Sequence, residues 1–170
     1  MDEEILSQYL TFALQEEKYA VSVTNVREVL ELVPITKVPG MPPFMKGVLN
    51  LRGSVVPVID FRKKFSLPES GGTVDTSIII LEIKTADGIM LVGALVDSVK
   101  EVIHIDAEQI EPAPSIGLNV DSDYILGMFQ HNSDFLIILN IDSVLKSGDI
   151  VKIPASAKNA EGVLKSDEKK

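Results

Sequence analysis

The sequence predicts an all-β protein with a few short helices, in which two similar small β units share one core. Short apolar segments separated by turn signals pair into four hairpins along the chain. The second half repeats the order of elements found in the first half, which predicts two related structural units. Many short strands at regular spacing favour barrels over open sheets. Apolar residues form 45% of the 170-residue chain, so a packed core is expected.

The first half opens with a hairpin and continues with a segment of changed period. Residues 9–14 and 19–23 have the alternating pattern of strands, and the polar residues between them are typical of a turn. In residues 23–32, apolar side chains fall at helical spacing, and Thr24 or Asn25 could cap a helix. One or two short helical turns are therefore expected there.

A second hairpin follows a proline-broken connection. Its strands are expected at 47–51 and 55–61, around the turn Arg52-Gly53-Ser54. Gly53 supplies a positive φ in that turn, and Asp60 is placed to cap the short helix "FRKKF". Arg52 interrupts an apolar run. It is therefore either a solvated turn residue or a group held at a fixed place for a partner.

The second half starts after a break rich in proline, glycine and polar residues at 66–75. Two further hairpins are expected, with strands at 76–83, 89–96, 124–129 and 135–141. Asp142 is expected to cap a last short helix.

The chain is expected to form one domain over residues 1–150. The first barrel would take about 15–70 plus a closing strand, and the second about 76–146 plus the N-terminal strand. The small and charged residues 152–170 have no periodicity and predict a flexible C-terminal tail.

Composition excludes several classes of function. A net charge of −9 argues against non-specific nucleic-acid binding and against binding to an anionic membrane surface. The chain has no cysteine, so it can form no disulfide or thiolate metal site. Its start has no long apolar run of the secretory type, and its longest apolar stretch, 88–96, is far shorter than the ~20 residues of a membrane span. A cytoplasmic protein without direct membrane insertion is expected.

The residues that carry chemistry are few. His104 and His131 are widely separated and do not supply the three or four ligands of a zinc site. The glycines of "ESGGT" lack the lysine of a phosphate-binding loop, and no serine stands in a nucleophile elbow. We therefore expect no catalytic residues, no cofactor and no metal, and we interpret the chain as a binding module.

The internal repeat is visible in two pairs of segments. "VREVLEL" at 26–32 resembles "VKEVIHI" at 99–105, and each precedes a proline-broken connection. Each connection then leads to a glycine, a hairpin and an acidic residue, from Gly47 to Asp60 and from Gly127 to Asp142. The two valine-rich segments are natural candidates to line a groove between the barrels.

The segment "KGVLNLRGSVVPVIDF" resembles the signature of the CheW family of chemotaxis coupling proteins. "YAVSVTNVREVLE", "VDSVKEVIHIDAEQIEPAP", "YILGMF" and "FLIILNIDSVL" agree with the family in order and spacing, so the resemblance covers roughly residues 9–146. It implies a CheW-like fold of two intertwined five-stranded antiparallel barrels, of SH3-like or OB-like type. It also implies a non-enzymatic adaptor that couples the cytoplasmic tip of methyl-accepting chemoreceptors to the regulatory domain of the histidine kinase CheA.

Other functions are compatible with the same residues. The chain could be a CheW-like scaffold for a different receptor–kinase system, or an excised regulatory domain of a CheA-type kinase. An enzyme or a small-ligand carrier built on barrels is a third class. A buried polar cavity in the structure would favour that class.

The resemblance implies a receptor-binding set and a kinase-binding set of residues. Receptor contacts are expected in the groove between the barrels, at Val26, Glu28, Val29, Arg52, Val99 and Val102. Kinase contacts are expected at a barrel end, at Ile35, Thr36, Val38 and Pro39. From the residues alone, any of these valines could equally belong to the core, and Glu28 could be solvated.

Two glycines and the turn arginine have separate expected roles. Gly47 and Gly53 are expected to serve the backbone as structural turn residues. A carboxylate partner is expected for Arg52, because a guanidinium presents a rigid fork that suits a carboxylate.

Overall fold

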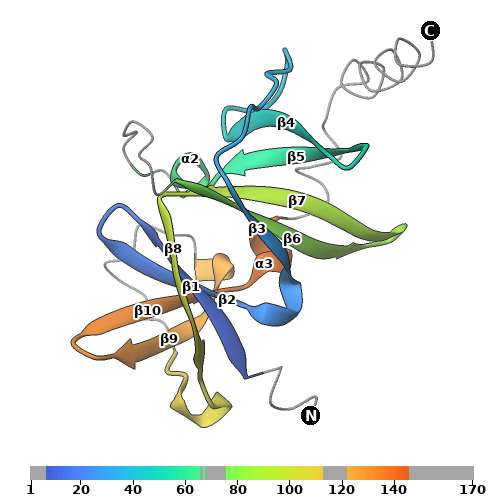
Figure 1. Cartoon of the computed structure of the whole chain (residues 1–170). Helices are drawn as coiled ribbons and strands as arrows, with labels where there is room; N and C mark the ends of the chain where they lie inside the picture. Colours follow the sequence, from blue (N-terminus) through green and yellow to red (C-terminus); the bar gives the residue numbers. More distant parts are fainter. Residues whose placement is uncertain (1–6, 66, 68–75, 113–121, 146–170) are drawn as a thin grey trace, which may run out of the picture.

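The computed structural model describes residues 7–65, 67, 76–112 and 122–145, and it confirms the predicted all-β class with short helices. Ten strands in these residues form two five-stranded sheets (Figure 1). The strands are β1 (Gln8–Leu14), β2 (Glu17–Ser22), β3 (Val26–Glu31), β4 (Met45–Leu51), β5 (Ser54–Asp60), β6 (Ser77–Thr85), β7 (Gly88–Val96), β8 (Ser98–His104), β9 (Ile125–His131) and β10 (Asp134–Leu139). The helical segments are η1 (Val23–Asn25), α2 (Phe61–Lys64), η2 (Ala107–Gln109), η3 (Ser122–Tyr124) and α3 (Ile141–Val144).

The strands are divided between the sheets differently from the prediction. The first sheet has the order β3-β6-β7-β5-β4, and the second sheet has the order β8-β1-β2-β10-β9. The prediction that the first barrel covers about 15–70 and the second about 76–146 is wrong for β2 and for the β6–β7 hairpin. The N-terminal strand β1 does lie with the later strands, as expected. The predicted tail, 152–170, lies outside the described residues.

Parallel pairing explains this exchange of strands. β5 pairs with β7 in parallel, and β2 pairs with β10 in parallel, whereas the other strand pairs are antiparallel. The two sheets are therefore mixed rather than wholly antiparallel. Hairpin patterns in a sequence reveal neighbours joined by a turn, but they carry no information about parallel partners far apart in the chain.

Strand β6 shows how the two sheets share a core. Its residues Ile78 and Ile80 are buried in a cluster inside the first sheet. The alternate residues Ile79 and Leu81 face a larger cluster, which also contains Phe12 of the second sheet. Because successive side chains of a strand point to opposite faces, a strand buried on both faces reads as an unbroken apolar run. The unbroken run "IIIL" at 78–81 therefore marks the strand that contributes to both cores.

The short helices only partly follow the sequence prediction. The expected helical turns over residues 23–32 reduce to η1, and β3 follows immediately. In β3 the half-buried positions alternate with exposed ones, because the strand pairs with β6. Asp60 caps α2, as predicted, by accepting a hydrogen bond from the Arg62 amide at 3.0 Å. Asp142 lies inside α3 and is not its cap, since Asn140 occupies the N-cap position.

Each sheet is closed by one isolated backbone bridge that passes over a glycine. Thr36, beyond β3, pairs with Val48 of β4 through two backbone hydrogen bonds of 2.8 Å. A Cβ on the preceding Gly47 would lie 2.2 Å from the Thr36 carbonyl oxygen. The second sheet repeats this arrangement, with Glu111 bridged to Met128 and lying close over Gly127. These bridges join the two edges of each sheet and make each one a barrel.

The predicted turn role is right for Gly53 and wrong for Gly47. Gly53 has a φ of 89° in the β4–β5 turn. Gly47 lies within strand β4, next to a register shift, and has a φ of 151°. The chain needs a glycine at position 47 because the closing segment crosses there, and no turn is present.

Replacing Gly47 and Gly53 by alanine should lower the free energy of unfolding by different amounts, because the two glycines meet different steric requirements. Gly47→Ala should cost about 2 kcal/mol or more of unfolding free energy, because it adds both an overlap with backbone and an unfavourable φ. Gly53→Ala should cost less, roughly 1 kcal/mol, because nothing lies within 4 Å of its added Cβ and only the φ is unfavourable. Urea unfolding of the three proteins measures both differences. Equal losses for the two variants would contradict the closure argument.

A candidate protein-docking face around Glu28 and Arg52

Arg52 occupies the first central position of the two-residue turn between β4 and β5. Its φ is 50°, and the following Gly53 also has a positive φ. Positive values at both central positions are the mark of a turn whose twist suits a tight hairpin. The side chain of Asn50 supports the turn by accepting a hydrogen bond from the Gly53 amide at 2.8 Å. The backbone therefore fixes where the arginine side chain starts.

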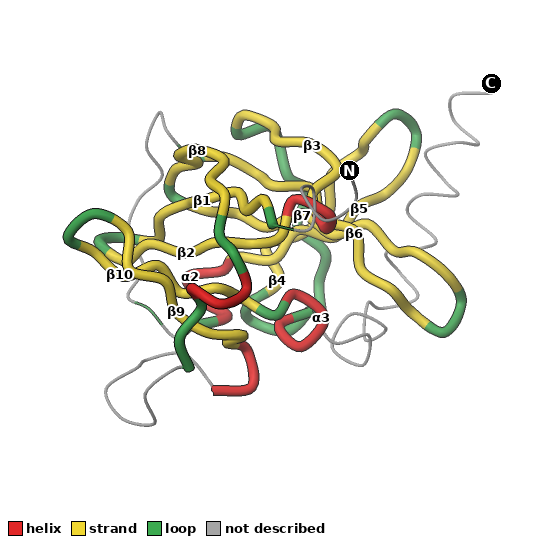
Figure 2. Tube along the Cα trace, turned by 90° about the horizontal axis from the view of Figure 1, so that it is seen from below, coloured by secondary structure: helices red, strands yellow, loops and turns green. Residues whose placement is uncertain are grey.

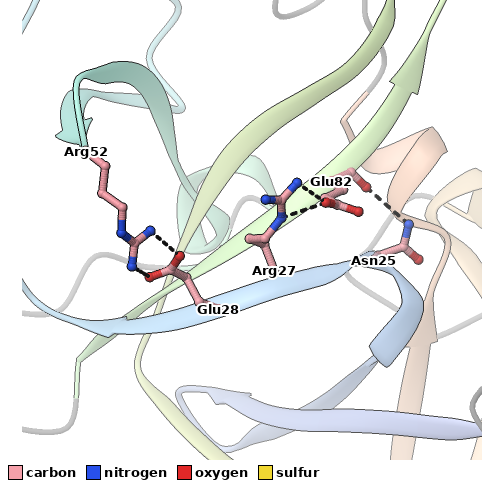
Figure 3. Close-up of polar contacts among 5 residues, drawn as sticks. All are labelled: Asn25, Arg27, Glu28, Arg52 and Glu82. Atoms are coloured by element: carbon pink, nitrogen blue, oxygen red, sulfur yellow. Dashed lines mark hydrogen bonds and ion pairs between the residues drawn. The ribbon is translucent and has the colours of Figure 1, made fainter.

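The guanidinium of Arg52 forms a two-pronged ion pair with Glu28 of β3 (Figure 3). Its Nη1 atom donates to Oε2 at 2.7 Å, and its Nη2 atom donates to Oε1 at 3.0 Å. The Arg52 side chain is 72% exposed and the Glu28 side chain only 23% exposed. Arg52 therefore already contacts a carboxylate within its own chain, and that carboxylate belongs to another residue of the expected receptor-binding set.

This ion pair lies across the seam of the first sheet. β3 and β4 are the two edge strands of that sheet, and Arg52 stands at the end of β4. The pair thus joins the same two edges as the backbone bridge between Thr36 and Val48. Because the pair is largely in water, its contribution to global stability is small. Its geometric effect is to hold two opposite charges in one fixed arrangement at the surface.

A second arginine–glutamate pair fastens β3 to its other neighbour. Arg27 Nε donates to Glu82 Oε1 of β6 at 2.7 Å, and the side-chain Nδ2 of Asn25 donates to the Glu82 backbone carbonyl at 3.3 Å (Figure 3). Consecutive residues of β3 therefore make ion pairs to strand β6 and to the β4–β5 turn. The strand that carries half of the expected receptor contacts is held on both sides.

The ion pair changes the acidity of Glu28. Hydrogen bonds from Arg52 lower the pKa of the Glu28 carboxyl below its ordinary value, with partial opposition from desolvation. The positive charges of Arg52 and Arg27 act in the same direction as the hydrogen bonds. In return, Glu28 raises the pKa of Arg52, first through the hydrogen bond and then through its charge. Both groups are therefore charged at neutral pH.

The four valines of the expected receptor-binding set divide into two classes. Val29 on β3 and Val102 on β8 are 42% and 54% exposed, although both are apolar. Val26 and Val99 are half-buried and pack against the shared core. Figure 2 places β3 and β8 along the same side of the molecule, which we call the β3/β8 face. Exposed apolar groups on this face therefore come from both sheets, and Val29 follows Glu28 directly in β3.

The expected kinase-binding residues follow β3 along the chain. Ile35 is half-buried against the core inside the first sheet, and Thr36 forms the closing bridge. Both therefore have a structural task as well. Val38 is half-buried and lines a shallow pocket of about 240 Å³, while Pro39 is exposed. Val38 and Pro39, unlike Ile35 and Thr36, have no described role in packing the core or closing the sheet.

Several other polar features lie outside the expected receptor-binding and kinase-binding sets. Lys18, Lys100, Glu101 and His131 line an open pocket of about 310 Å³ on the second sheet. His131 lies 3.5 Å from Glu101, and His104 lies 2.7 Å from Asp106. Within the residues that the structure describes, no three histidine, aspartate or glutamate side chains gather as metal ligands would. No described helix is long and apolar enough to cross a membrane.

The acidity of Glu28 gives a direct test of the ion pair in solution. The midpoint for Glu28, followed by the NMR shift of its carboxyl carbon, should lie below 4.5 and should rise toward that value in Arg52→Ala. Because the pKa is depressed, the pair stabilises the fold above the ordinary pKa and is lost as pH falls through the folded value. Lys84→Ala, which removes an exposed charge elsewhere, should leave the midpoint unchanged. An unaltered midpoint in Arg52→Ala would show that the pair does not form.

Comparison with known proteins finds one consistent group. The sequence model of the CheW-like domain family matches residues 8–149 of this chain. The chemotaxis protein CheW of Klebsiella aerogenes is 32% identical over 157 residues, which cover 92% of each chain. CheW of Bacillus subtilis is 37% identical over 137 residues, covering 80% of this chain and 85% of the relative.

A solved structure agrees with the fold described above. The scaffolding protein TtCheW from Thermoanaerobacter tengcongensis superposes with a TM-score of 0.75 and is 35% identical, covering 84% of this chain and 90% of that one. The residues that match the family model, 8–149, include both five-stranded sheets, because the described strands lie between residues 8 and 139. The chain therefore belongs to the family of CheW-like domains.

Proposed function

We propose that this protein is a non-enzymatic adaptor of bacterial chemotaxis, which couples the cytoplasmic tip of methyl-accepting chemoreceptors to the histidine kinase CheA. Its relatives are named as chemotaxis proteins, and its structural neighbour is named a scaffolding protein. The observation that carries the proposal is the β3/β8 face, which exposes one valine from each sheet and whose strand β3 also carries the fixed Glu28–Arg52 ion pair. The protein would act in the cytoplasm, at receptor arrays bound to the membrane.

The receptor side of the adaptor is assigned to the β3/β8 face. A receptor tip is a helical structure, and a helix is bound by an apolar floor with charges at its rim. Val29 and Val102 supply apolar contacts from two different sheets, and the Glu28–Arg52 pair supplies the charges. Exposed rim charges mainly select the partner and its register, whereas buried apolar contacts give most of the affinity. Val26 and Val99 support this surface from the core side.

The kinase side is assigned to the segment that follows β3. Val38 and Pro39 stand at the shallow pocket or beside it, while Ile35 and Thr36 hold the segment against the barrel. A docking surface at a barrel end would leave the β3/β8 face available to a receptor. One small domain could then bind two partners at once, which is what an adaptor requires.

The two surfaces should be separable by substitution. Val102→Asp should weaken binding of a receptor signalling fragment by roughly tenfold or more, because it places a charge in an apolar contact. It should leave binding of the CheA regulatory domain unchanged. Val38→Asp should have the opposite pattern. Calorimetry with each partner separately measures both effects. If each substitution weakened both partners equally, the assignment of two surfaces would be wrong.

A charge swap distinguishes two roles of the Glu28–Arg52 pair. If the pair acts only by holding β3 in place, Glu28→Arg/Arg52→Glu should restore what Arg52→Ala loses, since the swapped pair can still form. If a receptor reads the charges, the swap should bind no better than Arg52→Ala, which we expect to be weakened roughly tenfold. We expect the second result, measured with a receptor fragment and by kinase activity in a reconstituted mixture. Lys84→Ala is the matched control for loss of one exposed cation.

If the protein binds neither a chemoreceptor fragment nor the CheA regulatory domain, the alternative is favoured, namely a CheW-like scaffold for a different receptor–kinase system.

An enzyme or ligand carrier is the remaining class, and its site would be sought in the pocket lined by Lys18 and Lys100. Calorimetric titration with ATP should give no heat of binding at micromolar affinity. Stoichiometric ATP binding would contradict the adaptor-only proposal.

A further inference from the structure

A buried arginine lies where the two sheets meet. Arg62 is the second residue of α2, and its side chain is only 7% exposed. Its Nε atom lies 3.5 Å from Asp60 Oδ1, and its Nη1 atom lies 3.3 Å from Asp97 Oδ1. The Asp60 side chain is as buried as the arginine, and that of Asp97 is 21% exposed. A positive charge is thus held between two carboxylates in a mostly apolar region.

The two carboxylates belong to different parts of the fold. Asp60 ends β5, a strand of the first sheet. Asp97 is the single residue between β7 of the first sheet and β8 of the second sheet. The chain therefore passes from one sheet to the other at Asp97. Arg62 ties the end of a strand in the first sheet to the crossing point between the two.

Asp97 is tied in turn to the second sheet. Its Oδ2 atom accepts a hydrogen bond from the Gln15 amide in the β1–β2 turn at 2.5 Å. Its own amide donates to the Ala13 carbonyl of β1 at 3.1 Å. A continuous series of polar contacts thus runs from β5 through Arg62 and Asp97 to β1. We call these residues, Asp60, Arg62, Asp97 and Gln15, the inter-sheet brace.

The inter-sheet brace can select one orientation between the two sheets, which the shared apolar core does not. Apolar burial is non-directional, so the core holds the two sheets together without selecting one angle between them. A buried ion pair adds little to stability compared with apolar side chains of similar size, but it is satisfied in only one geometry. Its value is then in fixing an arrangement.

We propose that Arg62 is a positioning residue that fixes the orientation of the two sheets relative to each other. The spacing of the two strands on the β3/β8 face would then depend on it, because β3 belongs to one sheet and β8 to the other. Arg62 itself lies away from the solvent and needs no contact with a partner. This last step, from orientation to binding, rests on the proposed function, whereas the orientation itself does not.

Distance measurement between spin labels tests the brace in the free protein. The natural chain has no cysteine, so Ala86→Cys in the β6–β7 turn and Ser133→Cys in the β9–β10 turn give one exposed label site on each sheet. The test variant is Arg62→Met/Asp97→Asn. It removes both ion pairs of Arg62 but keeps the Asp60 cap and an oxygen acceptor for the Gln15 amide. We expect its distance distribution to be shifted, or about twofold wider than that of the parent.

The matched control is Arg27→Met/Glu82→Gln, which removes an ion pair within the first sheet. This control should leave the distribution unchanged. A distribution for Arg62→Met/Asp97→Asn that superposes on the parent would overturn the proposal. Should that variant not fold, Arg62→Lys keeps the charge without the fork and decides the question by the same criterion.

Binding to a receptor fragment adds a separate readout. Arg62→Met/Asp97→Asn should bind about tenfold more weakly than the parent when measured well below its thermal midpoint. That midpoint should be lower than the parent value, because Asp60 stays buried and loses its cation. An altered distance distribution with unchanged receptor binding would overturn the link from orientation to binding. If the parent itself binds no receptor fragment, the proposed function fails while the distance result still decides the brace.

Discussion

Closure of each sheet over a glycine is the constraint on which the rest of this structure depends. A five-stranded sheet has two edges with unpaired backbone groups, which attract other strands unless they are closed or covered. Thr36 and Glu111 close the two seams, and each can do so only because Gly47 or Gly127 leaves room beneath it. Once the first seam is closed, β3 and the β4–β5 turn are neighbours. The Glu28–Arg52 pair follows from that neighbourhood.

Apolar and polar interactions divide the work between cohesion and placement. The shared core draws side chains from both sheets and accounts for their association. The ion pairs of β3 lie in water and contribute little to cohesion, but they fix where charges stand. Arg62 differs from both, since it is a charged side chain that forms ion pairs within a mostly apolar region. Removing only one member would leave a buried charge without compensation, so single substitutions there report mainly that penalty.

The sequence predicted local features well and long-range pairing poorly. Hairpins, the Asp60 cap and the turn at Gly53 follow from residues close together in the chain, and all are confirmed. The prediction of helical turns in residues 23–32 is right only for η1, because the rest of the segment pairs with β6 and its apolar spacing suits either period. The exchange of β2 and of the β6–β7 hairpin was missed because parallel partners leave no local pattern. Arg52 was expected to meet a carboxylate, yet Glu28 could be identified only once the seam was closed.

Comparing the two halves of the internal repeat distinguishes features that the fold requires from features found in only one half. Arg52 stands at the same distance in sequence from Gly47 as Asn132 does from Gly127, and both have positive φ values, 50° and 58°. The tight hairpin is therefore common to both halves, and the guanidinium is not. Glu28 and Glu101 also match within the repeated segments, but Glu28 is held by Arg52 while Glu101 lies 3.5 Å from a histidine. Since asparagine tolerates this turn at least as well as arginine, backbone geometry gives no reason for the arginine in the first half. Its reason has to be sought in the charges that it and Glu28 present together at the surface.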